Sequence, residues 1–172
     1  MNIIICIKPD TCCCRPIQEL SRLRGGVTAY ENVKVSGETS LDGIAGDCYE
    51  MEVWMDMTEA VSAGIKLRVN EAKDEQTVLN FKRDENAVTL DRNKSGKGPG
   101  GVRKAPVELV NGILQLRIFV DRSSVEVFLQ DGAKVMTARI YPGETSTGIC
   151  FFAEGNVKII RLYKWDLKKV WE

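Results

Sequence analysis

The chain has 172 residues, of which 44% are hydrophobic and 28% charged, a composition that suits one globular domain with its own core. Lys+Arg and Asp+Glu each number 24, so the formal net charge is zero and creates no overall field to attract nucleic acid or an anionic membrane. The absence of histidine removes the commonest general base, the Ser-His and Cys-His nucleophilic pairs and the usual zinc ligand. These counts disfavour most catalytic designs and leave a two-carboxylate mechanism open.

Residues 1–15 show no hydrophobic periodicity, and we expect an irregular segment there. The apolar run Ile3–Ile7 is shorter than a signal-peptide core and has no basic residue before it. No export signal is therefore predicted in the chain as given, for which a cytoplasmic location would be expected. The localisation stays unknown, because a removed or upstream signal and secretion of a parent enzyme are open alternatives. No apolar run approaches the length of a membrane span.

The six cysteines include the triplet Cys12–Cys14. Structural zinc sites use separated pairs such as C-x-x-C, and adjacent cysteines are poor disulfide partners. We favour free thiols over a metal site in the triplet and expect no cofactor. Cys48 and Cys150 lie in β-type stretches and are expected to behave as small buried hydrophobic residues.

A short helix is predicted over residues 16–26. In PIQELSRLR the proline suits a first helical turn, and three apolar residues follow at helical spacing. The pair Gly25-Gly26 is expected to end the helix.

From residue 49 onward the apolar residues alternate with period two, which is the pattern of strands with one buried face. In the first such segment Met51 and Val53 share one face, and Glu50 and Glu52 share the other. Short strands separated by turn residues, with almost no helix, predict an all-β fold: an antiparallel two-sheet β-sandwich of the concanavalin A or lectin-like jelly-roll type. The alternating segments are YEMEVWM, GIKLRVN, TVLNFKR, AVTLDR, LQLRIFV, VEVFL, KVMTARIY, GICFFA and VKIIRLYKW.

Two further features have competing interpretations. The segment Asn93–Ala105 is rich in glycine and basic residues but lacks the G-x-x-x-x-G-K-[ST] phosphate-binding pattern, so we expect a solvated mobile loop. In VDRSSVEV, Asp121 and Glu126 could be the paired carboxylates of a glycosidase. We favour a tight hairpin with Asp121–Ser124 as its connection, because Asp and Ser side chains bond to nearby backbone in turns.

The segments LRIFVDRSSVEVFLQDG and TARIYP resemble the C-terminal β-sandwich domain of glycoside hydrolase family 32, which includes invertases, levanases, inulinases and sucrose-6-phosphate hydrolases. The blocks PIQELSRLR, GDCYEMEVWM, GIKLRVNE, VTLDRNKSG and KIIRLYKWDLKKVW agree in the same order. The resemblance covers about Pro16 to the end. It implies a sandwich domain over 16–172, with 16–26 as the linker that follows an irregular segment 1–15.

In this family catalysis resides in an upstream five-bladed propeller, whose three blocks are W-[ML]-N-D-P-N-G, E-C and R-D-P. The nearest matches in this chain are VWMDMT, Asp47-Cys48 and RDEN, and each lacks defining residues of its block. The resemblance therefore implies no catalytic residue here. The chain would be the sandwich part of a fructan or sucrose hydrolase, as a truncated chain, a split gene or a frameshift product.

A sugar-binding role is the alternative to a purely structural one. Asp and Arg grip vicinal hydroxyls through paired, charge-assisted hydrogen bonds. Asp91-Arg92 and Asp121-Arg122 both follow hydrophobic strands, and with Arg68 they are our candidate carbohydrate contacts. Trp residues are also frequent in sandwich cores, which is where we expect Trp54 and Trp165.

Three functions are thus predicted as alternatives. The first is a non-catalytic accessory domain that stabilises the propeller or the oligomer of the parent hydrolase. The second is a free-standing fructan-binding module, and the third is a protein-interaction module. The expected partners are the propeller, fructan or sucrose and, as an open alternative, further copies of the chain; nucleic acid, membrane and metal are not expected.

Overall fold

The computed structural model describes residues 5–6 and 14–168, and this part is almost entirely β-structure. In chain order its elements are β1 (Ile5–Cys6), β2 (Cys14–Arg15), the 3₁₀ helix η1 (Gln18–Leu23), β3 (Arg24–Thr39), β4 (Tyr49–Asn70), the 3₁₀ helix η2 (Glu71–Lys73), β5 (Glu75–Lys82), β6 (Ala87–Lys94), β7 (Val102–Pro106), β8 (Ile113–Asp121), β9 (Ser124–Leu129), β10 (Lys134–Arg139) and β11 (Gly148–Leu167).

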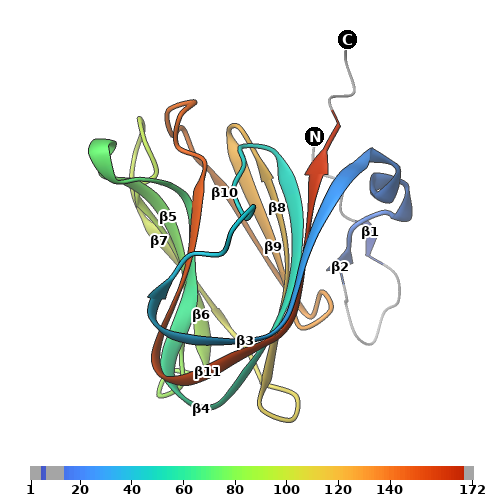
Figure 1. Cartoon of the computed structure of the whole chain (residues 1–172), viewed down its shortest axis with the longest axis vertical. Helices are drawn as coiled ribbons and strands as arrows, with labels where there is room; N and C mark the ends of the chain where they lie inside the picture. Colours follow the sequence, from blue (N-terminus) through green and yellow to red (C-terminus); the bar gives the residue numbers. More distant parts are fainter. Residues whose placement is uncertain (1–4, 7–13, 169–172) are drawn as a thin grey trace.

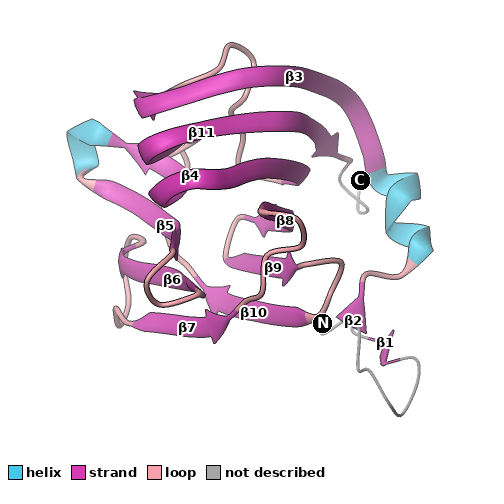
Figure 2. Cartoon of the chain, turned by 90° about the horizontal axis from the view of Figure 1, so that it is seen from below, coloured by secondary structure: helices cyan, strands magenta, loops and turns pink. Residues whose placement is uncertain are grey.

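Nine antiparallel strands form one hydrogen-bonded sheet that folds over into two layers (Figures 1 and 2). Strands β3, β4 and β11 run through both layers; β4 pairs with β8 along residues 49–56 and with β5 along residues 62–70. We name the layer β10-β9-β8-β4-β11-β3 sheet I and the layer β7-β6-β5-β4-β11-β3 sheet II. The predicted antiparallel two-sheet sandwich is confirmed.

Bulges and glycines let the long strands pass from one layer to the other. The pairing of β11 with β3 shifts its register between Ala153 and Val157, and Gly155 between them has a φ of +94°. A Cβ atom on Gly155 would lie 2.6 Å from the carbonyl oxygen of Glu59 in β4. The close approach of the two strands at this bend therefore requires glycine.

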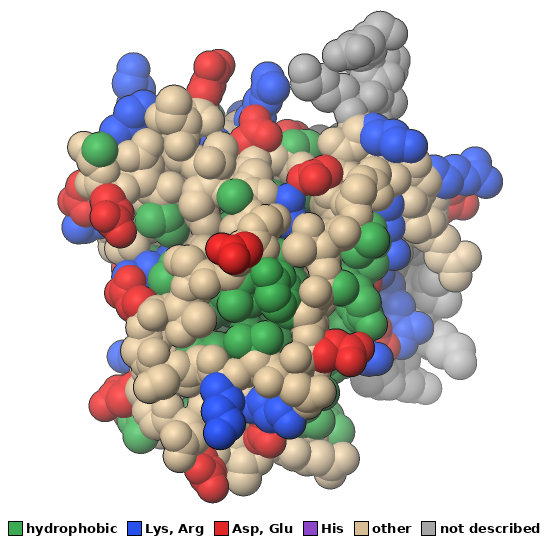
Figure 3. Space-filling model, in the orientation of Figure 1, with side chains coloured by type: hydrophobic (Ala, Val, Ile, Leu, Met, Phe, Trp, Pro, Cys, Tyr) green, Lys and Arg blue, Asp and Glu red, His purple; other side chains and the backbone are tan. Residues whose placement is uncertain are grey.

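The apolar faces of the two sheets pack together as the core. In the first half of β4, Tyr49, Met51, Val53 and Met55 have no exposed surface. The segment between β3 and β4 adds the buried Ile44 to the same cluster. In Figure 3 hydrophobic side chains remain visible in a hollow at the centre of the molecule, with charged side chains around it.

The predicted helix is present but shorter and tighter than expected. It is the 3₁₀ helix η1, and Arg24–Gly26, which we placed in the helix, already belong to β3. The prediction of its end was wrong because the pairing of β3 with β11 continues back to Arg24, opposite Leu167. Extended pairing thus replaces the last helical turn.

The cysteine predictions have mixed outcomes. Cys12 and Cys13 lie outside the described residues. The expectation of an irregular segment 1–15 is also modified, because strand β1 pairs with β2 there.

Cys48 and Cys150 are free thiols but only partly buried, and Cys48 lies in a bend rather than a strand. Burial, reinforced by the nearby carboxylates of Asp121 and Asp47, raises the pKa of Cys48 to about 11.

The glycine-rich segment is more ordered than we expected. Its first two residues belong to β6 and its last four to β7, and the remaining loop 95–101 is bonded to the segment after β10. The amide of Lys97 donates to the carbonyl of Tyr141 at 3.1 Å, and the amide of Tyr141 donates to Ser95 at 2.8 Å. A Cβ on Gly96, which has a φ of +83°, would lie 1.9 Å from the Tyr141 oxygen, so the loop requires glycine there.

Candidate functional site

The predicted hairpin at VDRSSVEV is confirmed. Asp121 ends β8 opposite Ser124, the first residue of β9, so the connection is the two-residue turn between them. The Asp121 carboxylate accepts a hydrogen bond from the backbone amide of Arg122 at 2.7 Å. Asp121 is thus used by the turn itself, as expected for an aspartate at this position.

Glu126 lies on the outward face of sheet I. It is opposite Phe119 in the β8–β9 pair, between Val125 and Val127, which face the core. Burial raises the pKa of Glu126 above its usual range. The geometry of the hairpin accounts for the positions of Asp121 and Glu126 without a substrate.

Arg68 is buried rather than available to a ligand. Its side chain is 1% exposed, and its guanidinium donates to the carbonyl oxygens of Ser146 at 2.6 Å, Gly143 at 3.3 Å and Asp47 at 3.3 Å. Arg68 therefore ties the segments before β4 and before β11 to the body of sheet II. In this position it cannot contact a polysaccharide.

The other four sugar candidates lie where the end of β6, the end of β10 and the β8–β9 turn come together, at one end of the sandwich. Arg92 in β6 donates to the carbonyl of Arg139, the last residue of β10, at 2.8 Å. The backbone amide of Ile140, which follows Arg139, donates to the carbonyl of Ser123 in the β8–β9 turn at 3.1 Å. This chain of contacts brings Asp91-Arg92 and Asp121-Arg122 to the same end, which we call the loop end. Their sugar binding stays a prediction.

An acidic side chain supports the same end. The Glu75 carboxylate accepts hydrogen bonds from the Ser146 hydroxyl and from the Gly143 amide, the latter at 2.8 Å. Burial opposes the charge of Glu75, but these hydrogen bonds outweigh it and lower the pKa of Glu75.

Stability should therefore depend on the charge of Glu75. The pKa of Glu75 is lower in the folded chain than in the unfolded chain, where it is about 4.3. Glu75 therefore contributes to the free energy of unfolding above that unfolded pKa, and this contribution is lost as the pH falls through the folded pKa. We expect the unfolding free energy of the wild type to fall more steeply than that of Glu75→Gln below about pH 5. Urea unfolding at a series of pH values measures this, and parallel curves for the two proteins would contradict it.

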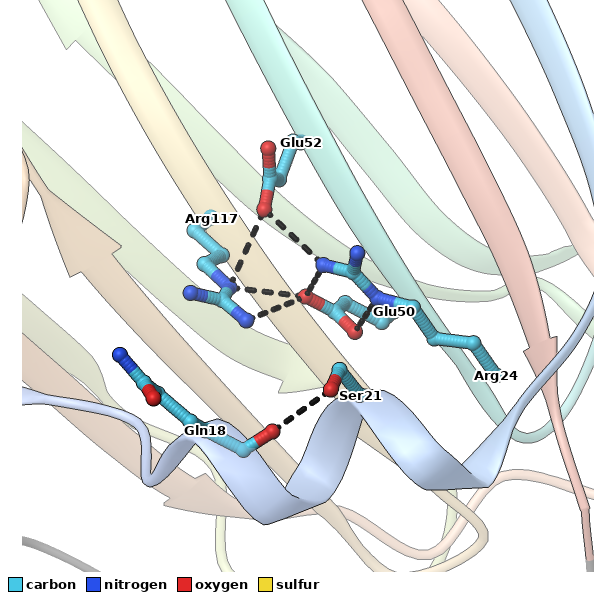
Figure 4. A network of polar contacts seen from close by, with 6 residues as sticks. All are labelled: Gln18, Ser21, Arg24, Glu50, Glu52 and Arg117. Carbon is cyan, nitrogen blue, oxygen red and sulfur yellow. Dashed lines mark hydrogen bonds and ion pairs between the residues drawn. The ribbon is translucent and has the colours of Figure 1, made fainter.

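A second surface was not predicted: the outward face of sheet I carries a buried ion-pair network (Figure 4). Glu50 in β4 is 0% exposed and accepts from Arg24 in β3 at 2.6 and 2.7 Å and from Arg117 in β8 at 2.8 Å. Glu52 is 3.2 Å from Arg24 and 3.3 Å from Arg117. Helix η1 passes beside this network, with Ser21 donating to the Gln18 carbonyl.

Aromatic rings extend this network along the sheet. The Arg24 guanidinium lies 3.7 Å from the ring centre of Trp165, which stacks with Tyr163 at 5.7 Å. Arg161 lies over Trp54 at 3.9 Å. We call this surface the arginine–aromatic face; its members are Arg24, Glu50, Glu52, Trp54, Arg117, Phe119, Phe128, Arg161, Tyr163 and Trp165.

Our expectation that Trp54 and Trp165 lie in the core was wrong. Both are partly exposed on the outward face. The sequence already indicated the outward position of Trp54. Alternate residues of a strand share a face, so Trp54 lies on the same face as Glu50 and Glu52 and on the opposite face from Met51 and Val53.

The described residues lack two kinds of feature. None of their helices is long and apolar enough to cross a membrane. Within the same ranges no three His, Cys, Asp or Glu side chains gather in a way that could hold a metal ion.

Comparison with known proteins identifies the family. The model of the glycosyl hydrolases family 32 C-terminal domain matches residues 19–166. The chain is 36% identical over 165 residues to a levanase of Bacillus subtilis and 33% identical over 156 residues to a sucrose-6-phosphate hydrolase of Staphylococcus xylosus. These alignments cover 91% and 90% of this chain but only 24% and 31% of the relatives.

Solved structures show the same fold. An exo-inulinase from Aspergillus awamori superposes with a TM-score of 0.79 and 24% identity, over 92% of this chain and 32% of that chain. A sucrose-6-phosphate hydrolase from Lactobacillus gasseri has a TM-score of 0.77 and 24% identity, over 94% and 32%. Sequence and fold together show that this chain belongs to the C-terminal domain family of glycosyl hydrolase family 32.

Proposed function

We propose that this chain is a non-catalytic accessory domain of a β-fructofuranosidase-type hydrolase, and that it stabilises a catalytic five-bladed propeller or the oligomer of the parent enzyme. Its extent supports the proposal, because the chain spans only a quarter to a third of the levanase and the sucrose-6-phosphate hydrolase that it resembles. The three catalytic blocks of the family are also missing from its sequence. Hydrolysis of sucrose or fructan then belongs to the rest of the parent enzyme.

A hybrid enzyme tests this proposal. In the sucrose-6-phosphate hydrolase of Staphylococcus xylosus, the region that this chain matches is replaced by residues 14–168 of this chain. We expect the hybrid to hydrolyse sucrose 6-phosphate and to resist heat better than the same enzyme without that region, because docking to a folded domain stabilises a partner. The purified chain alone should be inactive. Turnover by the chain alone, or a hybrid no better than the shortened enzyme, would contradict the proposal.

A second candidate function is fructan binding at the loop end. The observation in its favour is that Asp91-Arg92 and Asp121-Arg122 converge there although they are distant in sequence. Calorimetric titration with levan, inulin and fructose should then give heat, and Arg92→Ala and Arg122→Ala should each reduce it. Absence of heat at millimolar ligand would remove this candidate.

A further inference from the structure

We infer that the arginine–aromatic face of sheet I is the surface on which the catalytic domain docks, an inference that rests on the proposed function. The occupant is the portion that precedes the C-terminal family domain in the relatives, not a second copy of this chain. Three independent observations support this assignment: the composition of the face, the pairing of its charges and the course of the chain before β3.

The composition differs between the outward faces of the two sheets. On sheet II the positive partners of the ion pairs are lysines: Lys66 pairs with Glu38, and both Lys82 and Lys104 pair with Glu85. On sheet I the positive charges of the face are arginines stacked on aromatic rings. Arginine and aromatic residues are enriched in protein interfaces, and lysine is depleted. Sheet II thus has the character of a solvated surface, and sheet I that of an interface.

Four charged side chains at the centre of the face are already paired with each other. Two arginines, Arg24 and Arg117, surround two glutamates, Glu50 and Glu52, which gives a net charge of zero. A docking partner can cover such a network without leaving a charge unpaired, which is the main cost of burying ions. The network is therefore compatible with an interface that excludes water.

The chain before β3 reaches the domain on this side. The amide of Cys14 donates to the carbonyl of Gly132 at 2.9 Å, and Arg15 forms an ion pair with Asp131. Pro16 is buried, and the segment bounds a cleft of about 110 Å³ together with Trp54 of the face. Figures 1 and 2 show η1 and β2 on the outer side of sheet I. In the relatives the preceding domain must enter along this segment and is thereby held beside the face.

Two valines provide a matched pair of substitutions. Val27 in β3 and Val61 in β4 are each 57% exposed. Val27 is opposite Trp165 in the β3–β11 pair, so it lies on the outward side of sheet I at the border of the face. Val61 lies where β4 passes from its pairing with β8 to its pairing with β5, at the bend between the sheets. An aspartate at either site costs the isolated domain a similar loss of strand propensity. Only the aspartate at position 27 would place an unpaired charge against a docked domain.

The test uses the hybrid enzyme described above with three versions of residues 14–168: unchanged, Val27→Asp with Arg161→Glu, and Val61→Asp with Lys82→Glu. We expect the first double variant to lower the temperature of half-inactivation by about 5 °C or more and the second to leave it near that of the unchanged hybrid. Thermal unfolding of the full chain with the same substitutions shows that each version folds. Hydroxyl-radical oxidation of Trp54, Tyr163 and Trp165 should be slower in the hybrid than in the free chain.

The outcomes separate the two proposals. If the unchanged hybrid is no more stable than the enzyme without the region, the accessory function itself fails. If the unchanged hybrid is stabilised but both double variants behave alike and oxidation of the three aromatic residues is undiminished, the accessory function stands and the docking face is wrong. A third outcome is that sedimentation shows the free chain to self-associate, that Val27→Asp abolishes this association, and that the stability of the hybrid does not change with the first double variant. The occupant of the face is then a second copy of the chain, and the inference is overturned.

Discussion

Replacing Glu50 by glutamine is expected to lower the free energy of unfolding by about 3 kcal/mol, because the change leaves two arginines around a buried neutral group. Glu50 has no exposed side-chain surface, whereas the Arg24 and Arg117 side chains are 25% and 29% exposed. Partial solvation of the arginines places the expected loss at the low end of the range for broken buried pairs. Glutamine keeps the shape of the side chain, so packing changes little.

Urea unfolding of the isolated chain, followed by tryptophan fluorescence, measures this loss. Glu52→Gln is the matched control, because Glu52 bonds to the same two arginines at longer distances and is 21% exposed. Its cost should be about 1 kcal/mol, because Glu52 keeps contact with water and its ion pairs are longer than those of Glu50. Equal losses for the two variants would show that Glu50 does not organise the network.

Replacing Arg68 by methionine is expected to cost about 3 kcal/mol and to lower the melting temperature by roughly 6–12 °C. Methionine fills the space of the aliphatic stem but leaves the carbonyls of Ser146, Gly143 and Asp47 without their common donor. The backbone φ at position 68 is +55°, and both arginine and methionine carry a Cβ atom, so the strain of this conformation is the same in both proteins. The difference in stability therefore measures the loss of the guanidinium.

Arg92→Met is the control for this substitution. Arg92 is partly exposed and donates to the carbonyl of Arg139, so water can replace it and its loss should cost less than about 1 kcal/mol. Calorimetric melting of both variants gives the comparison. A fall for Arg68→Met that is no larger than for Arg92→Met would mean that the loops at this end are held by other contacts.

The sheet architecture could be predicted because period-two alternation reports burial directly. Met51, Val53 and Met55 face the core as their spacing requires, and the turn at Asp121 follows from side-chain chemistry. The same rule failed at Arg68. Strict alternation places its side chain on the outer face of the strand, because its neighbour Leu67 faces the core. A bulge between Leu67 and Asn70 shifts the register with β5 and turns the arginine inward.

The arginine–aromatic face was missed for a different reason. Alternation separates the inner and outer faces of a strand but does not say whether the outer face meets water. That distinction depends on cross-strand neighbours, here Arg24 and Arg117 on either side of Glu50, and strand pairing is not visible in one strand. The pairing of β3 with β11 joins residues more than a hundred positions apart and has no local signature.

That pairing sets the order in which this domain can fold. Strand β3 is the first long strand to be synthesised, and within the described residues it pairs only with β11, the last strand. Its edge therefore waits until the whole domain has emerged, and such distant contacts make folding slow.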